Sequence, residues 1–205
     1  FSTMKQLLFV SIAFPPKSDP ECLQTAKYYH YLQQQKKLSI EVLSSAIPTL
    51  FMPIDKDLER YDVGFSNKVE IKIPENKYLN FIWRKIFKEG IDWPDSKKVF
   101  HLQWKKAVQQ IQQKPDVIYS RSFPLSSAMM ALKLQQYYKV PWIMHLSDPW
   151  ADSPIHNYSP KQYAYHKKWE TACLKAASYV CFTSELTIEM YQKSHPEYKD
   201  KYQYF

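Results

Sequence analysis

The chain has 205 residues, of which 45% are hydrophobic and 23% are charged, and its formal net charge is +8. These values are ordinary for one soluble globular domain with a substantial core, and no apolar run approaches the ~20 residues that span a bilayer. The only two glycines, Gly64 and Gly90, exclude a glycine-rich dinucleotide fingerprint and a phosphate-binding P-loop, because each of these needs several glycines at one turn.

Apolar runs alternate with helical patterns along the chain. In chain order the predicted elements are strand 6–14, helix 21–35, strands 38–43 and 68–73, helix 99–112, strand 116–119, helix 125–138, strand 142–146, helix 160–177, strand 179–182 and helix 186–193. Strands that alternate with helices predict an α/β fold with a mainly parallel sheet. The alternating pattern of 68–73 is typical of a strand at the sheet edge.

The segment from Lys77 to Lys88 is amphipathic at helical spacing. Apolar side chains fill one half of a helical wheel, and the basic side chains fill the other half, with Phe81 among them. We favour an ordinary helix packed on the core. The same pattern is also typical of a helix that lies on an anionic membrane, so peripheral membrane contact stays open as a second interpretation.

Small hydroxyl or charged residues lie within or just after the ends of five of the predicted strands. These strand ends are Ser11, Ser44-Ser45, Ser120-Arg121-Ser122, Ser147-Asp148 and Thr183-Ser184-Glu185. The carboxyl ends of parallel strands meet at one edge of the sheet, where ligands of open α/β folds bind. This edge would suit sugars or phosphates, which are held by many directional hydrogen bonds.

His145 and Asp148 lie three residues apart where the strand 142–146 ends. Each residue alone is more typical of a satisfied histidine and of a helix-capping aspartate. Together, an imidazole and a carboxylate at a strand end favour a reactive site. We expect both side chains to lie exposed and close to each other on an open rim.

Cysteine spacing and charge distribution narrow the classes of partner. Cys22, Cys173 and Cys181 lack metal-ligand spacing and cannot all pair, which favours reduced thiols in a cytoplasmic protein and indicates no metal site. The lysines and arginines attract anions in general, but they are scattered along the chain. We therefore expect no nucleic-acid partner.

Two segments carry a resemblance to a known family. Residues 114–124 and 141–150, supported by Phe14-Pro15-Pro16 and by Val180 to Glu185, are similar to the amino-terminal half of family 4 glycosyltransferases of the GT-B type, also called glycosyl transferase group 1. The resemblance implies a Rossmann-like three-layer sandwich over 4–205 that forms the acceptor-side domain of a two-domain enzyme. The domain that binds the nucleotide sugar would then be absent from this chain.

The resemblance also implies roles for particular residues. It implies retaining transfer from a nucleotide sugar to a glycan or lipid-linked acceptor in polysaccharide biosynthesis, with no metal ion or other cofactor, and it places the enzyme in the cytoplasm or at the inner face of the membrane. Hydrogen bonds to the departing phosphate would do most of the catalytic work. The implied catalytic residues are His145 and Asp148, and the implied acceptor- or donor-binding residues are Lys17, Ser18, Arg121, Ser122, Phe123, Trp150 and Glu185. Arg121 would meet an anionic acceptor, and Lys17 or Ser18 would replace the backbone donors of the glycine loop that relatives have.

Two other functions remain open. A nucleotide-sugar 2-epimerase uses the same two-domain layout and would place acid and base residues in the same cleft. A non-catalytic Rossmann-like binding domain of the flavodoxin or receiver kind is less favoured, because Ala13-Phe14-Pro15-Pro16 supplies no carboxylate to hold magnesium after the first strand.

Overall fold

A computed structural model describes residues 4–46, 53–61, 67–74, 81–82, 85–86 and 93–205. The strands form one sheet in the order β3-β2-β1-β4-β5-β6-β7, and every neighbouring pair is parallel. Their bounds are β1 Lys5–Val10, β2 Leu38–Ser45, β3 Lys68–Ile71, β4 Val117–Arg121, β5 Trp142–Leu146, β6 Tyr179–Phe182 and β7 Tyr202–Tyr204. This strand order is Rossmann-like.

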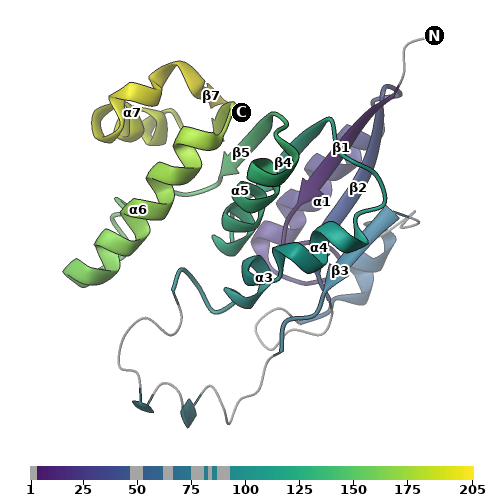
Figure 1. Cartoon of the computed structure of the whole chain (residues 1–205), viewed down its shortest axis with the longest axis horizontal. Helices are drawn as coiled ribbons and strands as arrows, with labels where there is room; N and C mark the ends of the chain where they lie inside the picture. The colour runs from purple at the N-terminus through teal and green to yellow at the C-terminus, as the bar shows by residue number, and fades with distance from the viewer. Residues whose placement is uncertain (1–3, 47–52, 62–66, 75–80, 83–84, 87–92) are drawn as a thin grey trace.

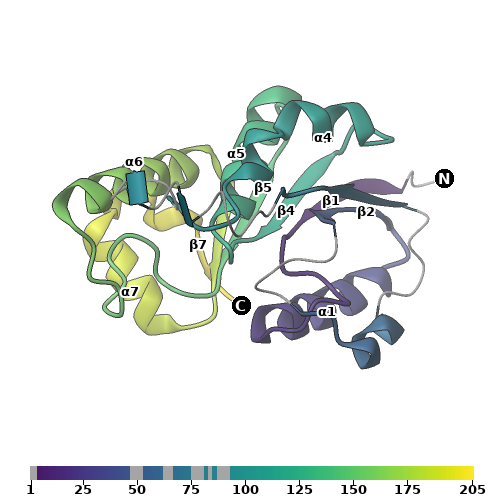
Figure 2. The ribbon, with the colours of Figure 1, turned by 90° about the horizontal axis from the view of Figure 1, so that it is seen from below.

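Helices cover both faces of the sheet. Figure 2 shows α1 below β1 and β2, with α4 and α5 above this part of the sheet. The bounds of the helices are α1 Pro20–Gln33, α3 Val99–Leu102, α4 Trp104–Gln110, α5 Ser126–Tyr138, α6 Pro160–Ala176 and α7 Glu185–Ser194, and the 3-10 helices are η1 Lys56–Tyr61 and η3 Pro196–Lys201. The prediction of an α/β, Rossmann-like three-layer sandwich is confirmed.

The core divides along the two faces of the sheet because successive strand residues point to opposite sides. Phe9 and Tyr119 point to the face that α1 covers and pack with Tyr29 of this helix. Val10 and Met144 point into the larger cluster on the other face. Burial on both faces explains why the central strands read as continuous apolar runs.

Capping residues define the starts of α1 and α6. The Asp19 carboxylate accepts a hydrogen bond from the Cys22 amide at 2.8 Å, and Pro20 occupies the first position of α1. The Ser159 hydroxyl accepts one from the Gln162 amide at 3.2 Å at the start of α6. Such caps satisfy amides that have no partner inside the helix.

The structure differs from the predicted elements in three places. The run 6–14 leaves the sheet after Val10, because the Ile12 amide donates to the Ser127 hydroxyl of α5 and the Phe14 amide to the Ile12 carbonyl, so these residues do not continue the ladder. The predicted helix 99–112 is interrupted at Gln103, which separates α3 from α4. Strand β7 was not predicted. The edge position of β3 is confirmed.

The basic amphipathic segment 77–88 lies largely outside the described residues, so the prediction of membrane contact stays untested. Within it, Phe81, Ile82 and Ile86 are exposed, and the Lys85 ammonium lies 4.6 Å from the centre of the Phe81 ring. Among the described helices, none combines the length and the apolar character that crossing a bilayer requires.

Candidate functional site

The carboxyl edge of the sheet contains a topological switch point between β1 and β4. From this point the chain builds outward in opposite directions, to β2 and β3 on one side and to β5, β6 and β7 on the other. The crevice outside the strand ends at such a point is where open α/β sheets bind ligands. The predicted strand-end residues do gather along this edge, because β1, β4, β5 and β6 are consecutive neighbours.

A buried ion pair lies at this edge of the sheet. The Arg121 guanidinium, at the end of β4, donates from Nε to Glu21 Oε1 at 2.9 Å, and its side chain is 1% exposed. The Ser147 hydroxyl, just after β5, donates to the same carboxylate and accepts from Arg121 Nη2 at 3.1 Å. Burial raises the pKa of Glu21, although Arg121 and Ser147 both oppose the rise.

Arg121 is therefore not presented to a ligand. Its guanidinium lies 4.6 Å from the centre of the Tyr28 ring and is satisfied by Glu21 and Ser147. In this conformation the guanidinium joins α1 to the sheet and exposes no atom. It therefore cannot make the predicted contact with an anionic acceptor. The sequence did not reveal this, because Glu21 lies 100 positions earlier in the chain.

His145 is buried, and the expectation of an exposed imidazole beside Asp148 is wrong for this residue. Its Nδ1 lies 2.8 Å from the Tyr119 hydroxyl, and its ring is covered by Tyr28 and Phe205 at centroid distances of 5.1 and 5.9 Å. Burial, together with the positive charge of Arg121, lowers the pKa of His145 to about 3. The imidazole is therefore neutral at pH 7 and lacks access to a substrate.

Lys17 also turns inward. Its ammonium donates to the Ile12 carbonyl at 2.9 Å and to the Ser44 hydroxyl at 3.0 Å, and its side chain is fully buried. Burial, reinforced by the nearby Lys68 charge, lowers the pKa of Lys17 to about 7. The predicted contact between Lys17 and a phosphate is thus not available in this conformation, and only Ser18 of the predicted loop pair is partly exposed.

Trp150 and Ser122 likewise lie beneath the surface. The Trp150 indole is buried and donates to His166 Nδ1 at 2.9 Å, while its backbone amide donates to the Tyr191 hydroxyl at 3.0 Å. Ser122 is buried with its hydroxyl 3.4 Å from that of Ser120. These two residues anchor the loops after β5 and β4, and neither exposes its side chain to a ligand.

The accessible part of the predicted site is smaller than expected. Asp148 and Glu185 are exposed, and Ser18, Phe123 and Ser147 are partly exposed. The ends of β5 and β6 are tied together by the Thr183 hydroxyl, which donates to the Ser147 carbonyl at 3.0 Å. Hydroxyls and carboxylates at this rim accept and donate hydrogen bonds, which is the chemistry that a hydroxyl-rich substrate requires.

Sequence reasoning missed the residues that complete the site from α1. Glu21 and Tyr28 are brought over the ends of β4 and β5 by the helix that follows β1. Tyr28, Tyr119 and Phe205 also line an apolar cavity of about 600 Å³ beside His145. The available signal was Glu21, one residue after Pro20, because an acidic residue in the first turn of a helix after a parallel strand lies at the carboxyl edge.

A second cluster has the side chains of a metal site. Ligand atoms of Asp152, Glu170 and His195 lie within 4.8 Å of one another. However, the Lys167 ammonium lies 2.6 Å from Asp152 Oδ2 and 3.5 Å from Glu170 Oε2. A resident cation of the chain thus neutralises these carboxylates, so the cluster gives no argument for a metal ion.

Comparison with known proteins gives a likeness in fold. No family model matches the chain, and no curated protein matches it. Among solved structures, a UDP-N-acetylglucosamine 2-epimerase matches with a TM-score of 0.58 and 12% sequence identity, over 98% of this chain and 47% of the epimerase chain. The chain thus spans about half the length of that structure. At this identity the likeness establishes the fold alone, a Rossmann-like α/β domain like one half of a GT-B-type protein.

Proposed function

We propose that this chain is the acceptor-side half of a GT-B-type glycosyltransferase. In the proposed reaction a sugar passes, with retention of configuration, from a nucleotide sugar held mainly by a second Rossmann-like domain to a glycan or lipid-linked acceptor held by this one. The observation that carries the proposal is the polar rim at the carboxyl edge, where Ser18, Ser147, Asp148 and Glu185 remain accessible around a switch point.

Within this proposal, Asp148 replaces the pair that the sequence suggested. Its exposed carboxylate accepts a hydrogen bond from the acceptor hydroxyl, while neighbouring hydroxyls orient the sugar. His145 acts only as a buried support, because its ring lies under Tyr28 and Phe205. Peripheral membrane contact through residues 77–88 is a further part of the proposal and would bring the enzyme to a lipid-linked acceptor.

A nucleotide-sugar 2-epimerase is the second candidate, because one solved structure with the same fold is a UDP-N-acetylglucosamine 2-epimerase. The two reactions differ in their products. An epimerase interconverts two nucleotide sugars without any acceptor, whereas a transferase releases the nucleotide only when an acceptor takes the sugar.

The experiment that separates these functions uses the protein encoded by the complete reading frame. It is incubated with UDP-N-acetylglucosamine and other labelled nucleotide sugars, with and without a membrane extract as acceptor, and the products are separated. Acceptor-dependent transfer supports the proposal, and isomerisation without acceptor supports the second candidate. Neither product from any nucleotide sugar would refute both.

A matched pair of variants tests the site. Asp148→Asn should lower turnover by about a hundredfold or more, because the carboxylate contacts the reacting group, while the protein stays folded. Asp200→Asn changes an equally exposed carboxylate in η3, before the amino end of β7, and should leave turnover unchanged. Full activity of Asp148→Asn would show that the reactive site lies elsewhere.

A further inference from the structure

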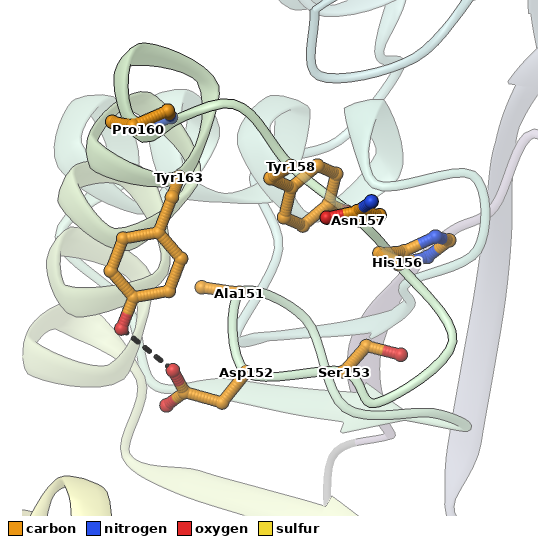
Figure 3. A pocket seen from close by; sticks show the side chains of 8 residues that line it. All are labelled: Ala151, Asp152, Ser153, His156, Asn157, Tyr158, Pro160 and Tyr163. Atoms are coloured by element: carbon orange, nitrogen blue, oxygen red, sulfur yellow. Dashed lines mark hydrogen bonds between the residues drawn. The ribbon is translucent and has the colours of Figure 1, made fainter.

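A second pocket lies beside the rim, between the loop that follows β5 and the first turns of α6. Figure 3 shows its walls, which we call the loop pocket: Asp152, Ser153, His156, Asn157, Tyr158 and Tyr163, with Ala151 and Pro160. Its volume is about 430 Å³. This volume falls within the range of roughly 300–1,000 Å³ that is common for small-molecule sites.

The Tyr158 ring, which forms one wall of the loop pocket, is held in place by buried residues. The Tyr158 ring stacks on His166, with centroids 4.4 Å apart and an interplanar angle of 18°. The exposed His156 ring also lies against Tyr158, at a centroid distance of 5.1 Å and an angle of 31°. His166 is itself fixed by the Trp150 indole, which donates to its Nδ1. The Tyr158 ring is therefore pre-oriented by a buried pair, which lowers the entropic cost of stacking a ligand on it.

The opposite wall is fixed by an ion pair. Asp152 accepts from the Tyr163 hydroxyl at 2.7 Å and from the Lys167 ammonium at 2.6 Å. Just before it, the Ala151 amide donates to Glu170 Oε1 at 3.2 Å. Both Lys167 and Glu170 lie on α6, so this side of the pocket is built on a helix and does not depend on the loop alone.

Three polar side chains of the pocket have unused hydrogen-bonding capacity. The Ser153 hydroxyl, the His156 imidazole and the Asn157 carboxamide form no hydrogen bond with another side chain or backbone group in the described part of the chain. Between them they offer donors and acceptors at the rim of two tyrosine rings (Figure 3). An aromatic face beside free hydroxyl, imidazole and amide groups matches a sugar ring, which has an apolar C–H face and a periphery of hydroxyls.

The charge of the loop pocket argues against an anionic ligand. Its one carboxylate, Asp152, is neutralised by Lys167, and the described residues that line the pocket include no lysine or arginine. A phosphate or carboxylate would therefore be desolvated here without a paired cation. A neutral ligand avoids this cost.

We propose that the loop pocket binds one neutral sugar ring, as a subsite for the acceptor glycan. The sugar displaces the exposed His156 ring, packs on Tyr158 in its place and exchanges hydrogen bonds with Asn157 and Ser153. The acceptor role rests on the proposed function, because the pocket follows Asp148 at the same strand end. The binding of a sugar ring itself does not depend on the reaction that the enzyme performs.

The test is a titration of the purified chain, followed by backbone amide chemical shifts. The probes are methyl glucoside, methyl N-acetylglucosaminide and lactose, each up to about 100 mM, since a single ring binds with millimolar affinity. We expect at least one glycoside to cause saturable shifts at Asn157, Tyr158 and the first turn of α6. Absence of saturable shifts there with all three probes would overturn the proposal.

Variants locate the binding. Asn157→Ala, at an exposed position, and Tyr158→Ala should each weaken binding by at least about tenfold, whereas Tyr158→Phe keeps the stacking ring and should retain most of it. Tyr179→Ala removes an exposed ring at the amino end of β6 and serves as the control. Thermal melting checks that each variant is folded. Undiminished binding in both alanine variants, or saturable binding of inorganic phosphate in place of the glycosides, would contradict the assignment.

The product assay described above distinguishes a failure of the proposed function from a failure of the sugar-site proposal. If the complete protein neither transfers nor isomerises a sugar while the glycoside shifts persist, the proposed function is wrong and the sugar site stands. If transfer occurs while the loop pocket binds no glycoside, the sugar site alone is wrong.

Discussion

Three of the four buried histidines, His101, His145 and His166, should make this protein sensitive to mild acid. Burial lowers the pKa of His101 and His166 to about 4, and burial with Arg121 nearby lowers the pKa of His145 to about 3. In the unfolded chain each imidazole has a pKa near 6.5. Below that pH the unfolded state binds more protons than the folded state, so stability is present above pH ~6.5 and is lost as the pH falls toward ~4.

The size of the effect follows from the same pKa differences. At pH 5 each histidine is mostly protonated in the unfolded chain and mostly neutral in the folded one, which costs roughly 2 kcal/mol per group. The three together reach about 5–6 kcal/mol, a large share of the roughly 5–15 kcal/mol by which domains are stable. Burial raises the pKa of Glu21 and Asp95, and proton uptake by these folded-state carboxyls offsets part of the loss.

The assay is urea unfolding, followed by tryptophan fluorescence at pH 7, 6 and 5. His101→Gln should reduce the loss between pH 7 and pH 5 by roughly 1.5–2 kcal/mol, because it removes one of the three protons taken up on unfolding. The exposed His30→Gln is the matched control and should leave the loss unchanged. An unchanged loss in His101→Gln would refute the account of a neutral, buried imidazole at this position.

Three further outcomes follow from the buried charges and thiols. Glu21→Gln should lower the free energy of unfolding, measured with urea, by about 3–5 kcal/mol, because Arg121 stays buried without its counter-charge. The double variant Glu21→Gln/Arg121→Met should recover most of this loss. An equal loss in the single and the double variant would speak against the ion pair. Lys17, whose pKa burial lowers to about 7, should make stability rise between pH 7 and pH 8, below the range where ionisation of the buried thiols in the unfolded chain opposes it, and Lys17→Met should reduce this rise; a rise of unchanged slope in the variant would exclude Lys17 as its source. Burial raises the pKa of the Cys181 thiol to about 11, and the other two cysteines are also buried. A thiol reagent at pH 8 should therefore label the folded chain only as fast as the chain unfolds locally. Immediate labelling would contradict the burial of the three thiols.

The fold was predictable because its signal is local. Strands such as β5 are short apolar runs between helical patterns, and their position depends on burial on both faces of the sheet. Strand β7 was missed for the opposite reason. Tyr202–Tyr204 has no apolar run of its own and becomes a strand by pairing with β6 at the edge of the sheet.

The strand-end residues were predictable in position but not in exposure. Parallel topology places His145, Arg121 and Asp148 at one edge, as expected. Whether a side chain there faces solvent depends on α1, which lays Glu21 and Tyr28 over the strand ends. Those contacts join residues about a hundred positions apart, and no local pattern in the sequence encodes them.

The central pairing of β1 with β4 has a consequence for how the chain is made. Lys5–Val10 leaves the ribosome more than a hundred residues before its neighbour Val117–Arg121, so a hydrophobic strand edge waits unpaired throughout that interval. At about 5–20 residues per second the wait lasts several seconds or longer. During translation, this unpaired edge is open to association with other nascent chains, and a chaperone that covers it would prevent that association.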